Sequence, residues 1–325
     1  MNRERVVERL EASQRILCSC HRRPDADALG SALGLSRFLR SMGKDVKVYV
    51  PEPLSPTLEY LVEPDEIVGA LAPGERFDLV IVTDTAAPSL LPKGLPSDAP
   101  LLVIDHHAAH EPFGDLVLRD VEATSTGEVV LGILDAMGLP EIPPKRVAEP
   151  LYAAVVADTG GFRYASTTAK TMRLGARLVE GGAEPWKTAR NLFEEWPPER
   201  LRLLAAVIET LALELDGKLA ILEVTREILA RTGADDDMVE GLVNYGRMLR
   251  GVEVAALLWE FDVQEGDRTR RDVKISLRSQ GTVDVSTIAV ALGGGGHRAA
   301  AGTQLQKTRE EAREALLSAV EKALS

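Results

Sequence analysis

The chain has 325 residues, of which 45% are hydrophobic and only 4% are aromatic. This length suits two domains of ordinary size, with cores built mainly from leucine, valine, isoleucine and alanine. The net charge is −12, which argues against a protein that holds long nucleic acid on a basic face and favours a small anionic substrate held by metal ions.

No apolar stretch approaches the roughly 20 residues that a membrane span needs. The first residues form an amphipathic helix pattern and lack the apolar core of a signal peptide, so we expect a cytoplasmic protein without a membrane partner. The two cysteines, Cys18 and Cys20, should lie on one face of a strand. We interpret them as buried small hydrophobic residues, with a Cys-x-Cys-His metal site as the alternative.

The first 160 residues alternate between short apolar runs and helical patterns. We expect strands at 15–20, 45–50, 77–83 and 100–104, and helices at 28–42, 126–137 and 147–157. Short, wholly apolar runs are typical of buried parallel strands. The pattern therefore predicts an α/β fold with a mostly parallel β-sheet flanked by helices, which binds ligands beyond the carboxyl ends of its strands.

The remaining residues show a different order of predicted helices and strands. A helix at 168–180 is followed by Pro197-Pro198, which interrupts the pattern before a second helix at 199–211 that should connect two domains. Beyond it we expect a hairpin at 213–216 and 218–224, helices at 237–249, 286–292 and 309–324, and strands at 252–261 and 271–278.

This second half is typical of a smaller α+β domain. We therefore predict a first domain at 1–190, a linker helix at 191–213 and a second domain at 214–325.

Polar residues that bind metals follow four of the apolar runs in the first half. They are His21, Asp25 and Asp27, then Asp84, then Asp105-His106-His107, and finally Asp158. Each alone has an ordinary explanation, because aspartates after strands and before helices are common turn or cap residues. Collected at one edge of a sheet, however, these carboxylates would repel one another strongly unless cations neutralised them.

Two divalent ions about 3.5–4 Å apart would remove that repulsion and would catalyse in-line phosphoryl displacement. Mixed carboxylate and imidazole ligands suit a cation such as Mn²⁺. Asp84 is the natural bridging ligand because it follows a central strand.

A second cluster is the glycine-rich run from Gly293 to Gly302, which includes His297 and Arg298. Exposed backbone amides in such loops bind phosphate, and His297, Arg298 and Arg278 would add side-chain donors. A flexible linker is the alternative interpretation, which the compact apolar patterns on both sides of the run disfavour.

These motifs resemble those of a known family. The run His21-x-x-Pro-Asp25-x-Asp27-Ala-Leu-Gly-Ser, with Asp84, Asp105-His106-His107 and Asp158-Thr-Gly, resembles the four motifs of the DHH phosphoesterase superfamily. The run Gly293-Gly-Gly-Gly-His297-x-x-Ala-Ala-Gly302 resembles the signature of the DHHA1 domain. Their order, their spacing and the length of the chain are similar to the standalone nanoRNase/pAp phosphatase type. The family pattern has glycine where this chain has Ala26, which is harmless if φ there is negative.

The resemblance implies two divalent ions in the first domain, with Mn²⁺ favoured over Mg²⁺ or Co²⁺. One would be held by His21, Asp25 and Asp84, and the other by Asp27, Asp84, His106 and Asp158. His107 would face the substrate phosphate with the support of Asp105, so that Asp84, Asp105 and His107 form the catalytic group. The second domain would bind the nucleotide through Arg278, Gly294, Gly295, Gly296 and His297; Arg163 and Arg247 are weaker candidates for phosphate contacts.

The same resemblance implies hydrolysis of short RNA oligonucleotides, of linear dinucleotides such as pApA and of 3′-phosphoadenosine 5′-phosphate (pAp), without binding of long duplexes. A cyclic di-AMP phosphodiesterase or a single-strand DNA exonuclease is the alternative within the class. An inorganic pyrophosphatase is disfavoured by the glycine-rich second domain. Outside the class, a non-catalytic nucleotide sensor is the alternative, although such a sensor is expected to lose ligands. The sequence leaves a homodimer open.

Overall fold

The computed structural model describes residues 3–265 and 268–324, in two compact units that divide between Glu195 and Trp196. The range 191–213 is not the single connecting helix that the sequence predicted. It holds the end of α7 (Pro185–Phe193), then α8 (Pro198–Ile208), then the start of β7 (Ala212–Glu214). Prolines cannot continue a helix from the preceding turn, so Pro197-Pro198 separates α7 from α8.

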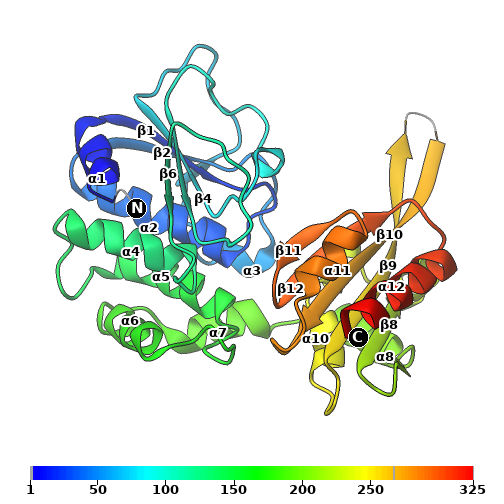
Figure 1. The fold of residues 1–325 in the computed structure, drawn as a ribbon. Coiled ribbons are helices and arrows are strands. Elements are labelled where there is room, and N and C mark those ends of the chain that lie inside the picture. Colours follow the sequence, from blue (N-terminus) through cyan, green and yellow to red (C-terminus); the bar gives the residue numbers. More distant parts are fainter. Residues whose placement is uncertain (1–2, 266–267, 325) are drawn as a thin grey trace. The chain divides into compact units, whose positions relative to one another are not determined.

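The first unit is built on a six-stranded sheet with the order β3-β2-β1-β4-β5-β6, in which every pair is parallel (Figure 1). Its strands are β1 (Arg15–Cys20), β2 (Asp45–Tyr49), β3 (Ile67–Val68), β4 (Leu79–Thr83), β5 (Leu101–Asp105) and β6 (Leu116–Arg119). The predicted α/β fold with a mostly parallel sheet is therefore confirmed. The strands β3 and β6 were not predicted from the sequence, because they are short and partly exposed.

The order of the strands reverses between β1 and β4, because the chain runs outward from β1 through β2 to β3 and then returns to β4. In parallel sheets this reversal opens a crevice at the carboxyl ends of the strands, where ligands bind. The register keeps these ends level, since Cys20 pairs with Thr83, and Thr83 pairs with Ile104. The residues that follow β1, β4 and β5 are thereby brought to one place.

Helices cover one face of this sheet. They are α1 (Arg3–Ala12), α2 (Ala26–Ser41), α4 (Thr126–Ala136) and α5 (Lys145–Asp158), with α6 (Ala169–Glu180) and α7 packed against α5 (Figure 1). A small apolar cluster around Leu17, Tyr49 and Val80 lies apart from the main core. The short helices α3 (Pro56–Glu59) and Pro88–Leu90 complete the unit. Cys18 and Cys20 are free and buried in β1, as expected.

The helices α2 and α5 pack unusually closely. A Cβ atom added at Gly30 would lie 2.3 Å from the Pro150 carbonyl oxygen, and one at Gly34 would lie 2.6 Å from the Leu151 side chain. Only glycine permits this approach at both positions of α2. The contact fixes the N-terminal half of α2 relative to the middle of α5.

Pro150 lies inside α5, where it cannot donate a backbone hydrogen bond to the Arg146 carbonyl. The Arg37 guanidinium, on α2, donates to that carbonyl instead, at 3.0 Å. It also donates to both carboxylate oxygens of Glu66, at 2.7 and 2.5 Å, and the two side chains are buried. A buried ion pair therefore supplies the hydrogen bond that the proline removes.

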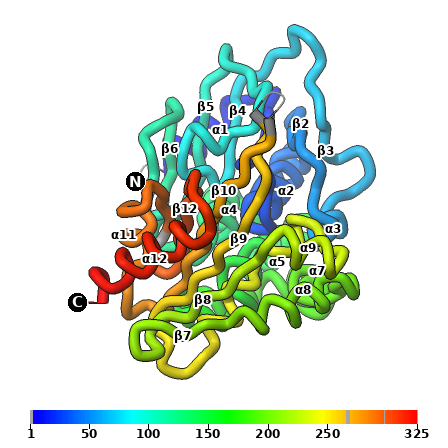
Figure 2. Tube along the Cα trace, turned by 90° about the vertical axis from the view of Figure 1, so that its right-hand side faces the viewer, coloured from blue at the N-terminus to red at the C-terminus, as the bar shows by residue number. Residues whose placement is uncertain are grey.

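The second unit contains a mixed sheet with the order β11-β12-β10-β9-β8-β7, in which only β8 and β9 pair in parallel (Figure 2). Its remaining strands are β8 (Leu219–Val224), β9 (Val254–Glu265), β10 (Arg268–Ser279), β11 (Gly295–His297) and β12 (Ala300–Leu305). Helices accompany the sheet, so the predicted smaller α+β domain is confirmed.

Both faces of the second sheet are buried. Along β8, Leu219 and Ile221 join one apolar cluster while Ala220 and Leu222 join another, as the alternation of a strand requires. The helices are α8, α9 (Arg226–Thr232), α10 (Val243–Arg247), α11 (Val285–Ala291) and α12 (Arg309–Leu324). The helix expected at 237–249 is split into a 3₁₀ turn at Asp236–Val239 and α10. Gly241, with φ of 82°, breaks it.

None of the helices in the described residues combines the length and the apolar character needed to cross a bilayer.

Candidate metal centre

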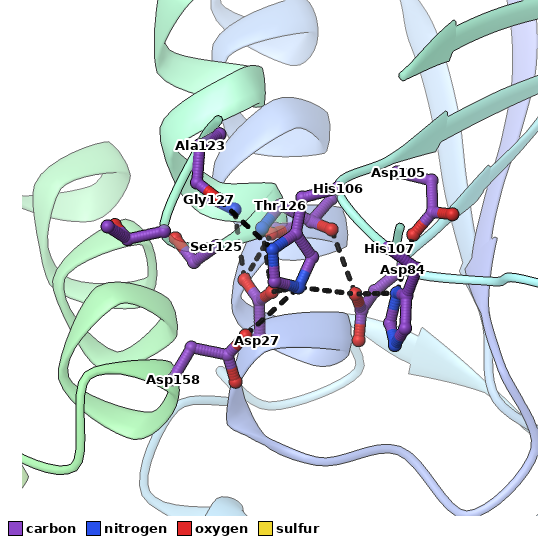
Figure 3. Close-up of polar contacts among 12 residues, drawn as sticks. Asp27, Asp84, Asp105, His106, His107, Ala123, Ser125, Thr126, Gly127 and Asp158 are labelled. Carbon is purple, nitrogen blue, oxygen red and sulfur yellow. Dashed lines mark hydrogen bonds and ion pairs between the residues drawn. The ribbon is translucent and has the colours of Figure 1, made fainter. Parts of the chain in front are cut away.

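All six residues that the sequence predicted as metal ligands lie together near the carboxyl ends of β1, β4 and β5. Three overlapping groups have ligand atoms within 4.8 Å of one another: His21, Asp25 and Asp84; Asp27, His106 and Asp158; and Asp84, His106 and His107. Figure 3 shows His106 between Asp27, Asp84 and Asp158, with His107 beyond Asp84. Segments 137 residues apart in the sequence, from His21 to Asp158, thus meet at one site.

The first aspartate of the cluster also caps a helix. Asp25 is the N-cap of α2, and its Oδ1 accepts a hydrogen bond from the Ala28 amide at 2.9 Å. Its side chain remains 54% exposed, so capping and metal binding are compatible roles. Ala26 is the first residue of α2 and does not have positive φ, so its methyl group adds no backbone strain where the family pattern has glycine.

Asp27 is wholly buried and is held from three sides. Its carboxylate accepts hydrogen bonds from the backbone amides of Thr126 and Gly127, at 2.7 and 2.9 Å (Figure 3). It also accepts a hydrogen bond from the Ser31 hydroxyl, at 3.2 Å. Those amides belong to the first turn of α4, where unpaired N–H groups attract anions. Ser125 caps the same helix, so the start of α4 serves as a rigid support for Asp27.

Asp84 occupies the centre of the cluster in a left-handed backbone conformation, with φ of 54°. Aspartate adopts this conformation more readily than most residues. Its Oδ2 lies 3.6 Å from His21 Nε2, and its Oδ1 lies 3.6 Å from His106 Nε2. Each oxygen therefore faces a different candidate group, which is the geometry that a bridging ligand needs.

The hydroxyl of Thr126 donates to Asp84 Oδ1 at 2.9 Å, so this threonine supports both Asp27 and Asp84. The sequence alone does not mark Thr126 as functional, because a threonine beside Ser125 at a helix start is explained by capping alone. The feature of the sequence that could have indicated Thr126 is its position at the start of a predicted helix, in the same half of the chain as the metal-binding motifs.

Two of the imidazoles are oriented by backbone carbonyls. His21 Nδ1 lies 3.0 Å from the Arg22 carbonyl, and His106 Nδ1 lies 3.3 Å from the Ala123 carbonyl. In both, the Nε2 atom faces the carboxylates, and His106 Nε2 lies 3.0 Å from Asp158 Oδ2. This arrangement, with one ring nitrogen hydrogen-bonded and the other directed at the site, is typical of histidines that bind metals.

His107 is held differently. Its Nδ1 lies 2.8 Å from Asp105 Oδ1 and 3.4 Å from Asp84 Oδ1. A buried carboxylate, rather than a carbonyl, therefore orients this ring. The structure brings the Asp105 carboxylate against the His107 ring, as the family resemblance implies.

The charges of the cluster perturb one another strongly. Burial lowers the pKa of His21 and of His106, but hydrogen bonds and charges from the aspartates outweigh it and raise the two values to about 9 and about 10. Burial and the charge of Asp84 raise the pKa of Asp27 far above its usual range. Burial also acts to raise the pKa of Asp84, but the hydrogen bond from His21 and the charges of the imidazoles lower it overall.

His21, His106 and Asp27 therefore bind protons more tightly than free side chains do. Divalent cations would replace those protons, because they neutralise the same charge. Four carboxylates and two oriented Nε2 atoms form a donor set that suits a borderline cation such as Mn²⁺. The residues present thus fit the metal ions that the motifs imply.

Comparison with known proteins agrees with this geometry. Residues 15–155 match the DHH family, N-terminal domain, and residues 216–325 match the DHHA1 domain. The NrnA protein of Thermus thermophilus, a bifunctional oligoribonuclease and PAP phosphatase, is 33% identical over 98% of this chain and 94% of the relative. The chain belongs to the DHH–DHHA1 phosphoesterase family. The resemblance seen in the motifs is confirmed.

Two further proteins are similar to nearly the whole of this chain. The cyclic-di-AMP phosphodiesterase PdeA of Listeria monocytogenes is 29% identical over 97% of this chain but only 49% of the relative. A crystal structure of an exopolyphosphatase-related protein from Bacteroides fragilis has a TM-score of 0.86 and 27% identity, and covers 99% of this chain and 96% of that one. As a DHH–DHHA1 protein, the chain is a hydrolytic phosphodiesterase or phosphatase.

The DHHA1 unit carries the residues predicted to bind the nucleotide. Arg278 lies near the end of β10, where its guanidinium donates to the Leu277 carbonyl at 2.9 Å. A Cβ atom at Gly294 would lie 2.2 Å from the Gly302 carbonyl oxygen, and Gly296 has φ of 141°. Both glycines are therefore required by the close approach of the backbone, and the run is partly strand rather than a flexible linker.

Gly295 has open space where a Cβ would lie, so it permits close approach of a ligand. The backbone of His297 lies in β11, but its side chain falls outside the described residues. Arg163, in the first unit, donates to the Gly160 carbonyl at 2.5 Å and stacks over Phe193. The nucleotide contacts of the DHHA1 unit and a phosphate contact at Arg163 stay predictions.

Proposed function

We propose that this protein is a Mn²⁺-dependent phosphoesterase that hydrolyses short oligoribonucleotides, linear dinucleotides such as pApA, and pAp by a two-metal mechanism. The observation that carries the proposal is the convergence of seven donor side chains in three overlapping groups, at the switch point of the sheet. Six of them are the proposed metal ligands His21, Asp25, Asp27, Asp84, His106 and Asp158, and the seventh is His107. The match to a named oligoribonuclease and PAP phosphatase over nearly the whole of both chains supports the substrate class.

One ion would be held by His21, Asp25 and Asp84, and the other by Asp27, Asp84, His106 and Asp158. When bound, the ions would stabilise charge on the phosphoryl oxygens and lower the pKa of water at the site. The protein holds the ligands in place beforehand, because the start of α4 and the Thr126 hydroxyl fix the carboxylates of Asp27 and Asp84. Little reorganisation is then needed as charge develops in the transition state.

We infer that His107 contacts the substrate phosphate. Its Nδ1–H donates to the buried Asp105 carboxylate, which fixes the ring. Burial lowers the pKa of His107, but this hydrogen bond and the charge of Asp84 outweigh it and raise the pKa overall, so the protonated ring would donate from Nε2 to a phosphoryl oxygen. Asp105 acts on the reaction through this ring. The resulting hydrogen bond would be charge-assisted and would strengthen as negative charge accumulates on the oxygen.

We infer further that the DHHA1 unit binds the nucleotide through Arg278, Gly294, Gly295, Gly296 and His297. A substrate of a few nucleotides is then oriented by contacts to one base and a few phosphates, and no long basic groove is needed. The net charge of −12 is compatible with such substrates. Short RNA and pAp as substrates also support a cytoplasmic location.

Hydrolysis of cyclic di-AMP is the second candidate, because the PdeA relative matches 97% of this chain. The match spans only about half of that relative, whereas the NrnA relative is matched over nearly its whole length. The higher identity to the NrnA relative, 33% against 29%, favours linear substrates. A single-strand DNA exonuclease and a non-catalytic sensor are two further alternatives, which the substrate panel described next distinguishes from the proposed function.

The test is a panel of substrates offered to the purified protein with Mn²⁺: pAp, pApA, cyclic di-AMP, RNA of two to five nucleotides and single-stranded DNA. We expect turnover of the short RNA, pApA and pAp. Preference for cyclic di-AMP or DNA would replace the proposed substrate class, and absence of any turnover would favour the sensor.

Two variants test the assigned roles within that panel. Asp84→Ala should abolish turnover, whereas the control Asp98→Ala, at an exposed position, should not change it. Near-normal activity of Asp84→Ala would contradict the bridging role. Arg278→Ala should raise KM strongly and leave the metal content intact, and loss of metal in that variant would show that Arg278 is wrongly assigned.

A further inference from the structure

A buried aspartate joins two histidines beside the metal centre. Asp105 is fully buried at the end of β5, and its Oδ1 lies 2.8 Å from His107 Nδ1. Its Oδ2 lies 2.9 Å from Nδ1 of His110, whose side chain is only 6% exposed. Both oxygens of the carboxylate are therefore engaged by imidazoles. His110 lies outside the motifs that identified the family, and none of the candidate metal groups among the described residues includes it.

His110 makes its polar contact through Nδ1. Its ring stacks on Phe113, with centroids 5.4 Å apart and planes inclined by 17°. Its Nε2 is buried and has no hydrogen-bond partner in the part of the chain that the structure describes. An unpaired buried ring nitrogen destabilises a protein, so Nε2 does not explain why a histidine is present here. The charge-assisted hydrogen bond from Nδ1 to Asp105 explains it.

The loop that carries His110 is fixed on both sides of this histidine. The Glu111 amide donates to the Ala86 carbonyl at 2.8 Å, two residues beyond the central Asp84. On the other side of His110, the Arg119 guanidinium donates to the Ala108 carbonyl at 3.1 Å. The loop is thus tied to neighbouring segments both before and after His110.

We propose that His110 is a positioning residue, which holds the Asp105 carboxylate so that this group in turn fixes the His107 imidazole toward the substrate phosphate. The inference rests on the proposed function of His107. A carboxylate bound at one oxygen can rotate about its terminal torsion angle, which has a broad energy minimum. A donor at each oxygen removes that freedom, and the direction of His107 Nε2 is fixed with it.

The contact predicts a specific pattern among substitutions of His110. The amide nitrogen of asparagine reproduces the position of Nδ1, whereas that of glutamine reproduces the position of Nε2, and phenylalanine keeps the ring without a donor. Loss of partners that orient groups around metal sites typically costs about 10–100-fold in activity or affinity. We therefore expect kcat to fall about 10–100-fold in His110→Phe and His110→Gln, and to stay near the wild-type value in His110→Asn.

Two further measurements separate positioning from a structural role. KM and Mn²⁺ affinity should be unchanged in all three variants, because His110 contacts none of the proposed ligands. In the double variant His107→Ala/His110→Phe, the second substitution should cause no further loss of activity. Equal losses in all three variants, a loss that follows the Mn²⁺ affinity, or an undiminished effect in the His107→Ala background would overturn the proposal.

A readout without turnover keeps the inference separate from the substrate assignment. The chain has five histidines, so their ring N–H signals can be assigned by substitution in ¹⁵N-labelled, Mg²⁺-loaded protein. We expect the His107 Nδ1–H proton to exchange slowly with solvent in the wild type and in His110→Asn, and about tenfold or more faster in His110→Phe. Equal exchange rates in all three proteins would refute the positioning role, even if the substrate panel showed no activity.

Discussion

The close packing of α2 against α5 can be tested by one methyl group. In Gly30→Ala the new Cβ would lie 2.3 Å from the Pro150 carbonyl oxygen, so the two helices must separate by about 1 Å to reach ordinary contact. Overpacking of this kind costs about 1–3 kcal/mol, against a gain of about 1 kcal/mol from the better helix propensity of alanine. Because the obstacle is backbone, we expect a net loss of about 2 kcal/mol in the free energy of unfolding.

The same displacement reaches the metal centre. Asp27 lies one turn before Gly30 on α2, and Asp158 ends α5, so their separation should increase with that of the helices. A misplacement of 1 Å can cost about 100-fold in rate. We expect kcat to fall by about 10–100-fold and Mn²⁺ binding, measured by isothermal titration calorimetry, to weaken.

Gly132→Ala is the matched control, because its new methyl would meet only the mobile end of the Arg3 side chain, at 3.3 Å. This variant should be unchanged or up to about 1 kcal/mol more stable. Urea denaturation measures both. If Gly30→Ala were as stable and as active as Gly132→Ala, the argument from helix packing to metal geometry would be wrong.

Three other predictions follow from the structure. Thr126→Val removes a hydrogen bond to the Asp84 carboxylate, and hydrogen bonds to charged groups contribute about 1.5–3 kcal/mol. The Mn²⁺ affinity measured by calorimetry should therefore fall about tenfold or more. An unchanged affinity would contradict the role of the hydroxyl. Glu66→Ala leaves the buried Arg37 charge without its partner and should lower the free energy of unfolding, measured by urea denaturation, by about 3–5 kcal/mol. A loss below about 1 kcal/mol would show that the backbone carbonyls alone are enough to stabilise the buried guanidinium. The pKa of His21, raised from 6.5 to about 9 in the metal-free protein, means that Mn²⁺ must displace its proton at neutral pH. The Mn²⁺ affinity should therefore rise about tenfold per pH unit for each proton released, and level off only above pH 10, because the pKa of His106 is raised to about 10. In the metal-free protein the raised pKa of His21 stabilises the fold below pH 6.5, and this contribution is lost as the pH rises through 9. Calorimetry in buffers of different ionisation enthalpy counts the protons, and zero release at pH 7.5 would refute the assignment.

The sequence predicted the site better than its surroundings. Asp84 and His106 could be placed at one edge because each follows a run of buried residues, and parallel strands end together. That inference needs only the order of elements and no knowledge of side-chain contacts. The family motifs then added the roles of the individual ligands, which geometry alone does not assign.

The supports of the ligands were not predictable in the same way. Thr126 and His110 act through atoms that meet their partners only after the chain has folded, across 42 and 5 residues respectively. Each has a common local explanation, as a helix-start residue or a loop residue, and no periodic pattern marks it. Contacts of this kind depend on tertiary structure, so a single sequence carries little signal for them.

Errors in the elements arose where tertiary structure or a turn overrides a local pattern. The strand β3 has only two residues and is partly exposed, so it has no apolar run to detect. The helix predicted at 237–249 has good periodicity, but Gly241 takes a left-handed conformation that ends it. The range 191–213 is not one linker helix, because Pro197-Pro198 interrupts it. These prolines were already visible in the sequence as a break in the helical pattern.

The proline inside α5 has a consequence for how this family varies. Pro150 leaves the Arg146 carbonyl without its usual backbone donor, and Arg37 takes that place. Any other residue at position 150 would restore an amide that competes with the guanidinium for the same oxygen. We expect the two positions to covary among homologues, with arginine at 37 accompanying proline at 150 and shorter or apolar side chains accompanying its absence.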